Sequence, residues 1–223
     1  MKPRTWAACT LVIACGALWA GRALSDEKKP GESKGVAATP PTPAEMKKMM
    51  AEWMALGKPG DPHKALESTV GTWSTEMKLV APGMPPMVTR GTSERKWVLG
   101  GRFIEERSSG DMIGPDEKSP IGFGKIKSDG IGLVGYDNYK NIYTGVWISD
   151  LGTNMMTMSG TMPPGSNTLT MYGLMDEPML KMSDRYNKYV TRIVDNDKFV
   201  FEVYDLAAGP DHKVFEITYT RKK

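Results

Sequence analysis

Apolar and polar residues alternate along most of the chain between residues 72 and 221. A period of two is typical of β-strands that bury one face. The breaks between the alternating stretches are rich in Gly, Asn, Asp and Pro, which favour tight turns. We expect strands near residues 72–79, 87–99, 102–109, 131–136, 142–149, 154–162, 168–175, 185–194, 199–205 and 213–221.

No helical period separates these strands, so they are predicted to form an antiparallel meander. A sheet of about ten strands must curl, and closing it into a barrel removes its exposed edges. We therefore predict an all-β domain over residues 70–223, with the meander closed into a β-barrel. The long, polar, glycine-rich stretch Gly114–Gly130 is expected to be an inserted surface loop or a flap over the barrel mouth.

A helical segment is predicted before the strands, over residues 44–69. Large apolar residues recur near a period of 3.6 in Ala44–Leu56, which indicates an amphipathic helix. These residues are Met46, Met49, Met50, Trp53, Met54 and Leu56. Thr42 and Glu45 are spaced as a capping box, and Gly57 is a suitable stop. A second short helix is expected from Pro62 to about Val70.

The first 25 residues have the layout of a secretory signal peptide. Two basic residues precede an apolar stretch over residues 6–20, and Ala23 and Ser25 place small side chains before a cut at Asp26. The apolar stretch is shorter than the ~20 residues that a spanning helix needs. The sequence therefore predicts an exported protein, periplasmic or secreted, with no membrane span.

Both cysteines of the chain, Cys9 and Cys15, lie inside this signal. Cleavage before Asp26 would leave a mature chain without disulfides, thiol catalysis or thiolate metal ligands. An alternative is that the segment ending in Cys15 acts as a bacterial lipoprotein box, so that Cys15 carries a lipid anchor. Residues 26–43 mix Lys, Glu, Gly, Ala and Pro, and are expected to form a disordered tether.

Composition and charge narrow the function classes. The chain is 40% hydrophobic and 25% charged, which excludes a collagen-like, mostly disordered or multi-span membrane protein. Three of its basic residues and none of its acids lie in the signal, so the net charge of +3 disappears after cleavage. A balanced charge offers no electrostatic case for binding nucleic acid or an anionic membrane surface.

Two sets of residues resemble known families. Gly71-Thr72-Trp73 at the first strand, with Arg221 closing the last, resembles the calycin (lipocalin-like) barrels. In that group the tryptophan plugs one end and a basic residue packs over it, so the resemblance implies a barrel-closing pair, Trp73 and Arg221. Cation–aromatic packing gives the pair a physical basis.

A second resemblance covers about residues 45–222. The chain is similar to a bacterial family known as domain-of-unknown-function family 1579. The motifs that carry the similarity are HKALESTVGTW (63–73), GTSERKWVLGGRF (91–103), IGLVGYDN (131–138), GTNM (152–155), YVTRIVDNDKFVFEVY (189–204) and FEITYTRK (215–222). This resemblance implies a calycin-like barrel, often exported, and supplies no catalytic residues. The stretch 114–130 is longer than the family leads us to expect.

Several side chains are candidates for contact with a ligand in the barrel, because half of each strand's residues must point inward. The aromatic candidates are Trp97, Tyr136, Tyr143 and Trp147. Glu94 and the pair Arg192–Glu202 could face the lumen and bind a ligand's polar group, or form structural salt bridges. Placing Arg192 opposite Glu202 gives the last hairpin but one an apolar face, and the sequence leaves open whether the pair lies inside or outside.

No metal or cofactor site is predicted. The two histidines, His63 and His212, lie in different elements without a second ligand nearby. The chain has 17 methionines, three of them within residues 155–158, and these are expected to fill apolar space rather than bind Cu(I). No nucleophile, phosphate-binding or dinucleotide-binding motif occurs, so no catalytic residue is assigned.

These observations favour an exported protein that binds a small, hydrophobic ligand inside a barrel. The alternative is an envelope structural or interaction protein with a solid barrel core and a protein partner of unknown kind. An enzyme acting on a lipid-like or haem-like substrate is a third reading, and it rests on fold analogy alone.

Overall fold

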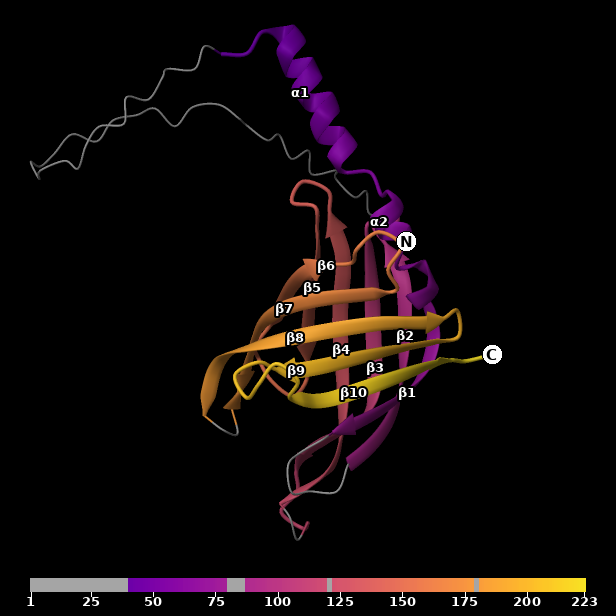
Figure 1. Ribbon diagram of the computed structural model, residues 1–223, viewed down its shortest axis with the longest axis vertical. Coiled ribbons are helices and arrows are strands. Elements are labelled where there is room, and N and C mark those ends of the chain that lie inside the picture. The colour runs from indigo at the N-terminus through magenta and orange to yellow at the C-terminus, as the bar shows by residue number, and fades with distance from the viewer. Residues whose placement is uncertain (1–39, 80–86, 120–121, 179–180) are drawn as a thin grey trace, which may run out of the picture. The chain divides into compact units, whose positions relative to one another are not determined.

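A computed structural model describes residues 40–79, 87–119, 122–178 and 181–223. Its strands close into one antiparallel barrel, in which neighbours along the chain pair with each other and the last strand pairs with the first (Figure 1). The predicted all-β meander barrel is therefore confirmed. The strands are β1 (Gly71–Leu79), β2 (Met87–Val98), β3 (Phe103–Pro115), β4 (Phe123–Asp137), β5 (Ile142–Ser149), β6 (Met156–Thr161), β7 (Thr168–Glu177), β8 (Met182–Asp195), β9 (Lys198–Asp205) and β10 (Lys213–Arg221).

The helical segment contains α1 (Pro43–Leu56), α2 (Asp61–Lys64) and a 3₁₀ turn, η1 (Glu67–Thr69). The predicted capping box of α1 is present: the Glu45 backbone N–H donates to Thr42 Oγ1 at 3.3 Å, and the Thr42 N–H donates to Glu45 Oε2 at 2.7 Å. The prediction of a single helix over residues 62–70 is wrong, because this segment is divided between α2 and η1.

The second helix stops early because the carbonyl of Leu66 accepts hydrogen bonds from Thr69. The backbone N–H and the hydroxyl of Thr69 donate to it at 2.9 and 2.7 Å, in place of the longer-range bonds of an α-helix. The resulting turn lets the buried Leu66 enter the barrel core.

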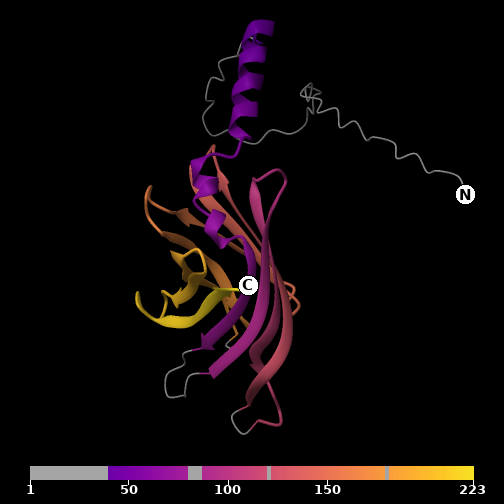
Figure 2. The same cartoon turned by 90° about the vertical axis from the view of Figure 1, so that its right-hand side faces the viewer.

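This turn closes one end of the barrel, beside α2 in Figure 2. The Tyr143 hydroxyl donates to the Pro62 carbonyl at 2.8 Å, and Trp73 Nε1 donates to the Thr69 carbonyl at 3.1 Å. We call this the closed end, and the end with the β3–β4 and β9–β10 connections the open end.

The stretch Gly114–Gly130 is neither an inserted loop nor a flap. It forms the outer arms of a long β3–β4 hairpin, in which Gly114 pairs with Gly124 and Gly110 pairs with Ser128. A Cβ at Gly114 would lie 2.2 Å from Ile126 Cδ1. Glycine at such a position therefore makes room for a side chain of the neighbouring strand and does not mark a loop.

The register assigns an inner face to every strand, because residues opposite each other in an antiparallel pair share one face of the sheet. Trp73, which is fully buried, lies opposite Ser93 on β2 and Arg221 on β10. Ile104 and Val203, also fully buried, lie on the same inner face. The regular parts of the strands therefore place every second residue in the interior.

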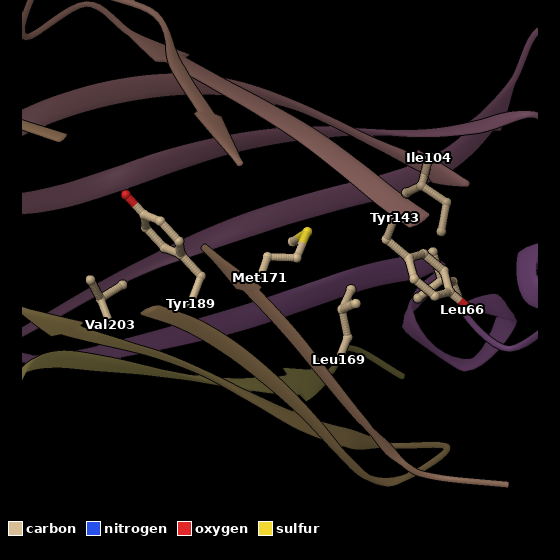
Figure 3. Packing of buried hydrophobic residues seen from close by; sticks show 7 residues of the cluster. All are labelled: Leu66, Ile104, Tyr143, Leu169, Met171, Tyr189 and Val203. Atoms are coloured by element: carbon tan, nitrogen blue, oxygen red, sulfur yellow. The ribbon is translucent and has the colours of Figure 1, made fainter. Parts of the chain in front are cut away.

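The β7–β9 side of the interior is filled by side chains. A cluster of buried residues runs from Leu66 at the closed end to Val203 near the open end (Figure 3). Its members are Leu66, Ile104, Tyr143, Leu169, Met171, Tyr189 and Val203. A second cluster joins Trp73, Phe199 and Tyr219, in which the Phe199 and Tyr219 rings stack with centroids 4.1 Å apart.

The β8–β9 register differs by two residues from the one expected. Val200 lies opposite Arg192, and Val190 lies opposite Glu202. The pairing shifts at a bulge beside Ile193, next to the tight turn that joins the strands. A slip of two residues keeps each side chain on its predicted face, so the apolar face survives although the predicted pairing is wrong.

Candidate binding site in the barrel

The barrel holds a cavity of about 80 Å³ beside β1–β5 and β10, and this cavity is partly open to solvent. Its inward-facing wall carries hydroxyl groups, thioethers and aromatic rings, and the charged side chains of Arg90 and Asp111 also line it. These inward-facing residues are Thr75, Met77, Thr89, Ser108, Met112, Ser128, Trp147, Ser149, Ile217 and Tyr219, with Gly91, Gly110 and Gly130 between them. We refer to this space as the lumen cavity.

Trp147 forms one wall of the lumen cavity by lying flat against β4. A Cβ at Gly130 would lie 2.2 Å from Trp147 Cζ2, and a Cβ at Gly132 would lie 3.0 Å from Trp147 Cε3. The indole ring thus covers two inward-facing glycines, which leave the space that it occupies. One face of the ring rests on backbone, and the ring borders the cavity.

Thr89, one of the residues that line the cavity, carries a buried hydroxyl group. The residue is 1% exposed, and its Oγ1 has no hydrogen-bond partner in the part of the chain that the structure describes. A buried hydroxyl without a partner costs about 1–3 kcal/mol.

A buried polar network lies behind the cavity, toward the closed end. The Tyr219 hydroxyl donates to Glu106 Oε1 at 3.0 Å, the Ser93 hydroxyl donates to the same oxygen at 2.8 Å, and Arg95 binds Glu106 Oε2. Burial, together with the nearby Glu106 carboxylate, raises the pKa of Tyr219 well above its usual value. The tyrosine therefore stays a neutral donor, and the charge of Glu106 is balanced by Arg95.

A second group of polar side chains lies near the open end on β7–β9. Arg185 forms an ion pair with Asp205, and burial raises the pKa of the neighbouring Glu177. Among the described residues, the Asn187 Oδ1 and the Tyr189 hydroxyl are buried without partners. Burial, with the Glu177 charge, raises the pKa of Tyr189 to about 12, so this hydroxyl is protonated at neutral pH.

The four aromatic candidates all face inward, but they lie in different surroundings. Tyr143 belongs to the buried cluster, and Trp97 and Tyr136 pack against it near the closed end. Trp97 Nε1 also donates to Glu67 Oε2 at 2.6 Å. Trp147 alone of the four borders the lumen cavity.

The charged candidates lie outside the barrel. Glu94 is exposed on the outer face of β2, and Arg192 and Glu202 are on the outer faces of β8 and β9. Arg192 Nη2 still contacts Glu202 Oε2 at 3.2 Å, diagonally across the two strands. Of the two alternatives that the sequence left open, the structure has these side chains outside, because the inner face of β9 is the one that carries Phe199, Phe201 and Val203.

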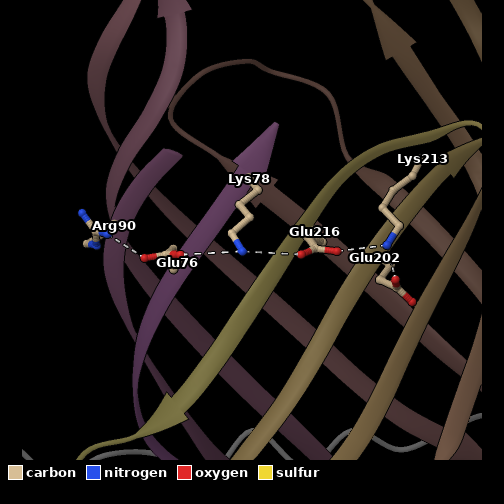
Figure 4. A network of polar contacts seen from close by, with 6 residues as sticks. All are labelled: Glu76, Lys78, Arg90, Glu202, Lys213 and Glu216. Atoms are coloured by element: carbon tan, nitrogen blue, oxygen red, sulfur yellow. Dashed lines mark hydrogen bonds and ion pairs between the residues drawn. The ribbon is translucent and has the colours of Figure 1, made fainter. Parts of the chain in front are cut away.

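Glu202 instead joins a row of alternating charges on the outer surface of β2, β1, β10 and β9 (Figure 4). Lys213 bridges Glu202 and Glu216, and Lys78 connects Glu216 to Glu76, with distances of 4.0 Å on both sides of Lys78. Arg90 ends the row, 2.7 Å from Glu76 Oε2. This arrangement explains the charged side chains structurally and without a ligand.

No metal site appears among the described residues, where no three His, Cys, Asp or Glu side chains are grouped around a common point. His63 is buried, and its Nδ1 accepts a hydrogen bond from the Gly60 N–H at 3.1 Å. His212 lies in the β9–β10 connection. Within the described ranges, no helix has the length and apolar character needed to cross a bilayer.

The sequence did not predict the Thr and Ser side chains that line the cavity. Their signal was present in the strands, where Thr75, Thr89, Ser108 and Ser128 occupy inward positions of the period-two pattern. Small polar residues at positions where apolar ones are expected indicate a space that side chains do not fill. Sequence alone could not show that these positions face one another.

The family is established by the comparison with known proteins. A model of DUF1579, described as a protein of unknown function, matches residues 58–221. The chain belongs to the DUF1579 family. The match confirms the resemblance seen in the sequence motifs, and it begins just after α1. No curated protein matches the chain.

Two solved structures are similar to this DUF1579 protein. The crystal structure of Rv2717c from M. tuberculosis is 13% identical, with 74% of this chain and 100% of that chain covered at a TM-score of 0.50. A redesigned β-barrel is also 13% identical, covering 71% of this chain and 96% of its own, at a TM-score of 0.36. At these identities the likeness to Rv2717c concerns the fold alone.

Proposed function

We propose that this DUF1579 protein is an exported binding protein that holds a small molecule in its lumen cavity. The observation that carries the proposal is a cavity in the barrel whose wall includes inward-facing Thr75, Ser108 and Ser128. A protein whose barrel served only as a solid support would gain stability by filling this space with apolar side chains. The hydroxyl wall instead retains polar groups at a cost to stability.

The lining also bears on the kind of ligand. The apolar half of the interior is occupied by the buried cluster around Met171 and Tyr189, whereas the cavity has Thr89, Ser108 and Ser149 in its wall. Apolar pockets for drug-sized ligands occupy about 300–1,000 Å³. A cavity of about 80 Å³, lined by thioether, aromatic and hydroxyl groups, favours a ligand smaller than drug-sized molecules.

Native mass spectrometry of the mature chain, purified from its own cell envelope, tests this function. A reproducible mass above that of the denatured chain, lost on denaturation, is expected and would identify the ligand. A bare native mass in repeated preparations would contradict the proposal and favour a solid structural barrel.

Export is part of the proposal, and it rests on the signal layout of residues 1–25, which lie outside the described residues. The denatured mass from the same experiment reads the N-terminus directly. A chain starting at Asp26 supports signal cleavage, and a lipid mass on Cys15 supports the lipoprotein alternative. If the protein is absent from the cell envelope and still begins with Met1, export is excluded.

A second candidate function is an interaction protein that docks through α1 into an apolar groove of a partner protein. The observation that favours it is that α1 buries none of its residues, and Trp53 is 63% exposed. Methionine-rich helix faces adapt to partner grooves. Removing residues 26–57 should leave the barrel's stability unchanged and abolish partner capture. Unfolding of the truncated chain would instead show that α1 is part of the barrel's own structure.

A further inference from the structure

A second hollow of the molecule lies at the closed end, where three segments far apart in the sequence meet. It is an open cleft of about 670 Å³, bordered by the end of α1, the β2–β3 turn and the β4–β5 turn. Pockets of about 300–1,000 Å³ hold drug-sized ligands. We call this hollow the closed-end cleft. Among the described residues, it has no lining residue in common with the lumen cavity.

Aromatic rings give the closed-end cleft an apolar lining that a ligand can reach. Trp53 on α1 is 63% exposed, and Tyr139 on the β4–β5 turn is 79% exposed. Half-buried Phe103 lies against Gly135 of β4, where a Cβ would be 2.5 Å from Phe103 Cδ1. Tyr136, also half-buried, adds a further ring. The cleft thus combines rings fixed against the barrel with rings open to solvent.

Hydrogen bonds join the end of α1 to the β4–β5 turn. The last carbonyl groups of a helix have no partner within the helix. Asn138 Nδ2 donates to the carbonyls of Leu56 and Lys58, at 2.7 and 2.9 Å. Asp137 Oδ1 accepts the Tyr139 backbone N–H at 2.8 Å, which fixes the turn itself. The two sides of the cleft are therefore connected before a ligand binds, and less entropy is lost on binding.

The closed-end cleft also contains a cation without a counter-ion. Arg102 is exposed, and its Nη1 donates to the Leu99 carbonyl at 2.9 Å. Its guanidinium forms no ion pair within the part of the chain that the structure describes. Burial, together with the Arg102 charge, lowers the pKa of His63, which also lines the cleft. Asp137 lines the cleft as well, but it is held by the turn and does not neutralise Arg102.

We propose that the closed-end cleft binds a planar aromatic carboxylate, with its ring against Trp53 and Phe103 and its carboxylate on the Arg102 guanidinium. Aromatic rings pack on one another in offset-stacked or edge-to-face arrangements. The planar guanidinium donates parallel hydrogen bonds that match the two oxygens of a carboxylate. This site goes beyond the function proposed above, because it lies apart from the lumen cavity and makes α1 a wall of a ligand site.

Three probes that differ in charge test the recognition of the carboxylate. Benzoate, benzamide and benzamidine share one planar frame and are negative, neutral and positive at neutral pH. Ligand-observed NMR titration of the full mature chain measures the dissociation constant of each probe. Benzoate is expected to bind at least about tenfold more tightly than the other two, because charge-assisted hydrogen bonds are the stronger ones. Cyclohexanecarboxylate keeps the charge without the flat ring, and should bind less tightly than benzoate.

Matched variants assign the binding to the closed-end cleft. Arg102→Gln should lower the affinity for benzoate about tenfold. Arg107→Gln, which removes an exposed arginine from the outer face of β3, should leave it unchanged. Trp53→Leu should also weaken binding, whereas Met46→Ala, two turns earlier in the same helix, should not. All four side chains are exposed, so the amide NMR spectrum of the barrel should stay the same in every variant.

The outcomes of these titrations are separate from the test of the proposed function. Equal binding of the three charged and neutral probes, or an unchanged benzoate affinity in Arg102→Gln, overturns the carboxylate site. Equal binding of benzoate and cyclohexanecarboxylate, or an unchanged affinity in Trp53→Leu, overturns the aromatic assignment. A bare native mass contradicts the lumen-cavity function and leaves the closed-end cleft to be decided by the probes.

Discussion

The Arg221 guanidinium lies over the indole ring of Trp73, with its central carbon 4.2 Å from the ring centroid. The two residues are opposite each other where β1 and β10 close the barrel. Arg221 also donates to the carbonyls of Val70 and Ser68 at 2.8 Å each, and to that of Asn196 at 2.6 Å. One side chain thus joins the last strand, the turn at the closed end and the β8–β9 connection.

Arg221→Lys should lower the free energy of unfolding by about 2 kcal/mol, because a lysine ammonium cannot reproduce the planar set of hydrogen bonds while remaining over the ring. Urea unfolding followed by tryptophan fluorescence measures the change. Arg107→Lys, on the exposed outer face, is the matched control and should change stability by less than about 0.5 kcal/mol. Equal effects of the two variants would contradict the role given to Arg221.

Glu106→Gln should be more damaging, with a loss of about 3 kcal/mol, because it leaves the charge of Arg95 buried without its counter-ion. The exposed Glu94→Gln on the outer face of β2 serves as the control and should be nearly neutral. Chemical denaturation of both variants at neutral pH makes the comparison. A neutral effect of Glu106→Gln would show that the ion pair between Glu106 and Arg95 does not stabilise the fold.

The two inward tyrosines of the buried cluster should respond in opposite directions to removal of their hydroxyls. Tyr143→Phe loses the hydrogen bond to the Pro62 carbonyl and should cost about 1 kcal/mol. Tyr189→Phe removes a buried hydroxyl that has no partner among the described residues, and should raise the stability of the ligand-free protein by about 1 kcal/mol. Destabilisation by Tyr189→Phe would indicate that its hydroxyl is satisfied in solution.

Acid should weaken the closed end through His63. Burial, with a smaller effect of the Arg102 charge, lowers the pKa of His63 below its usual value of 6.5. As the pH falls below 6.5, the unfolded chain therefore takes up a proton before the folded chain does, and the stability present at higher pH is lost. Protonation of Nδ1 would also remove the acceptor for the Gly60 N–H.

Denaturation midpoints measured between about pH 7.5 and 5.5 test this dependence. The decline should be smaller in His63→Asn, which does not titrate. His212→Asn, which removes the other histidine of the chain, should retain the decline of the natural protein. An identical pH dependence in all three proteins would exclude His63 as the responsible group.

The sequence alone was sufficient for the order of the strands and for the alternation of faces along them, although β3 and β4 are longer than predicted. A period of two is a local property, and it survives any slip of two residues, which is why the apolar face of β9 was predicted correctly although Arg192 was paired with the wrong neighbour. The capping box at Thr42 and Glu45 was predictable for the same reason, since both partners lie within one helical turn.

Tertiary structure decided the register, the hairpin at Gly114–Gly130 and the place of each candidate side chain. The glycines in that stretch suggested a loop, yet at Gly114 they make room for Ile126 on the next strand. The apolar residues of α1 indicated an amphipathic helix, and the structure leaves them exposed. A local sequence pattern predicts neither outcome, because each depends on which strand or surface lies next to the segment.

The sequence by itself thus determined the period-two pattern of the strands, since alternation specifies the two faces of a strand without reference to distant residues. Only the tertiary structure decided that Thr89 and Trp147 border one cavity while Tyr143 and Trp97 lie at the packed closed end. The reason is geometric: a cavity is enclosed by side chains from six strands, and their meeting depends on barrel closure rather than on any one segment.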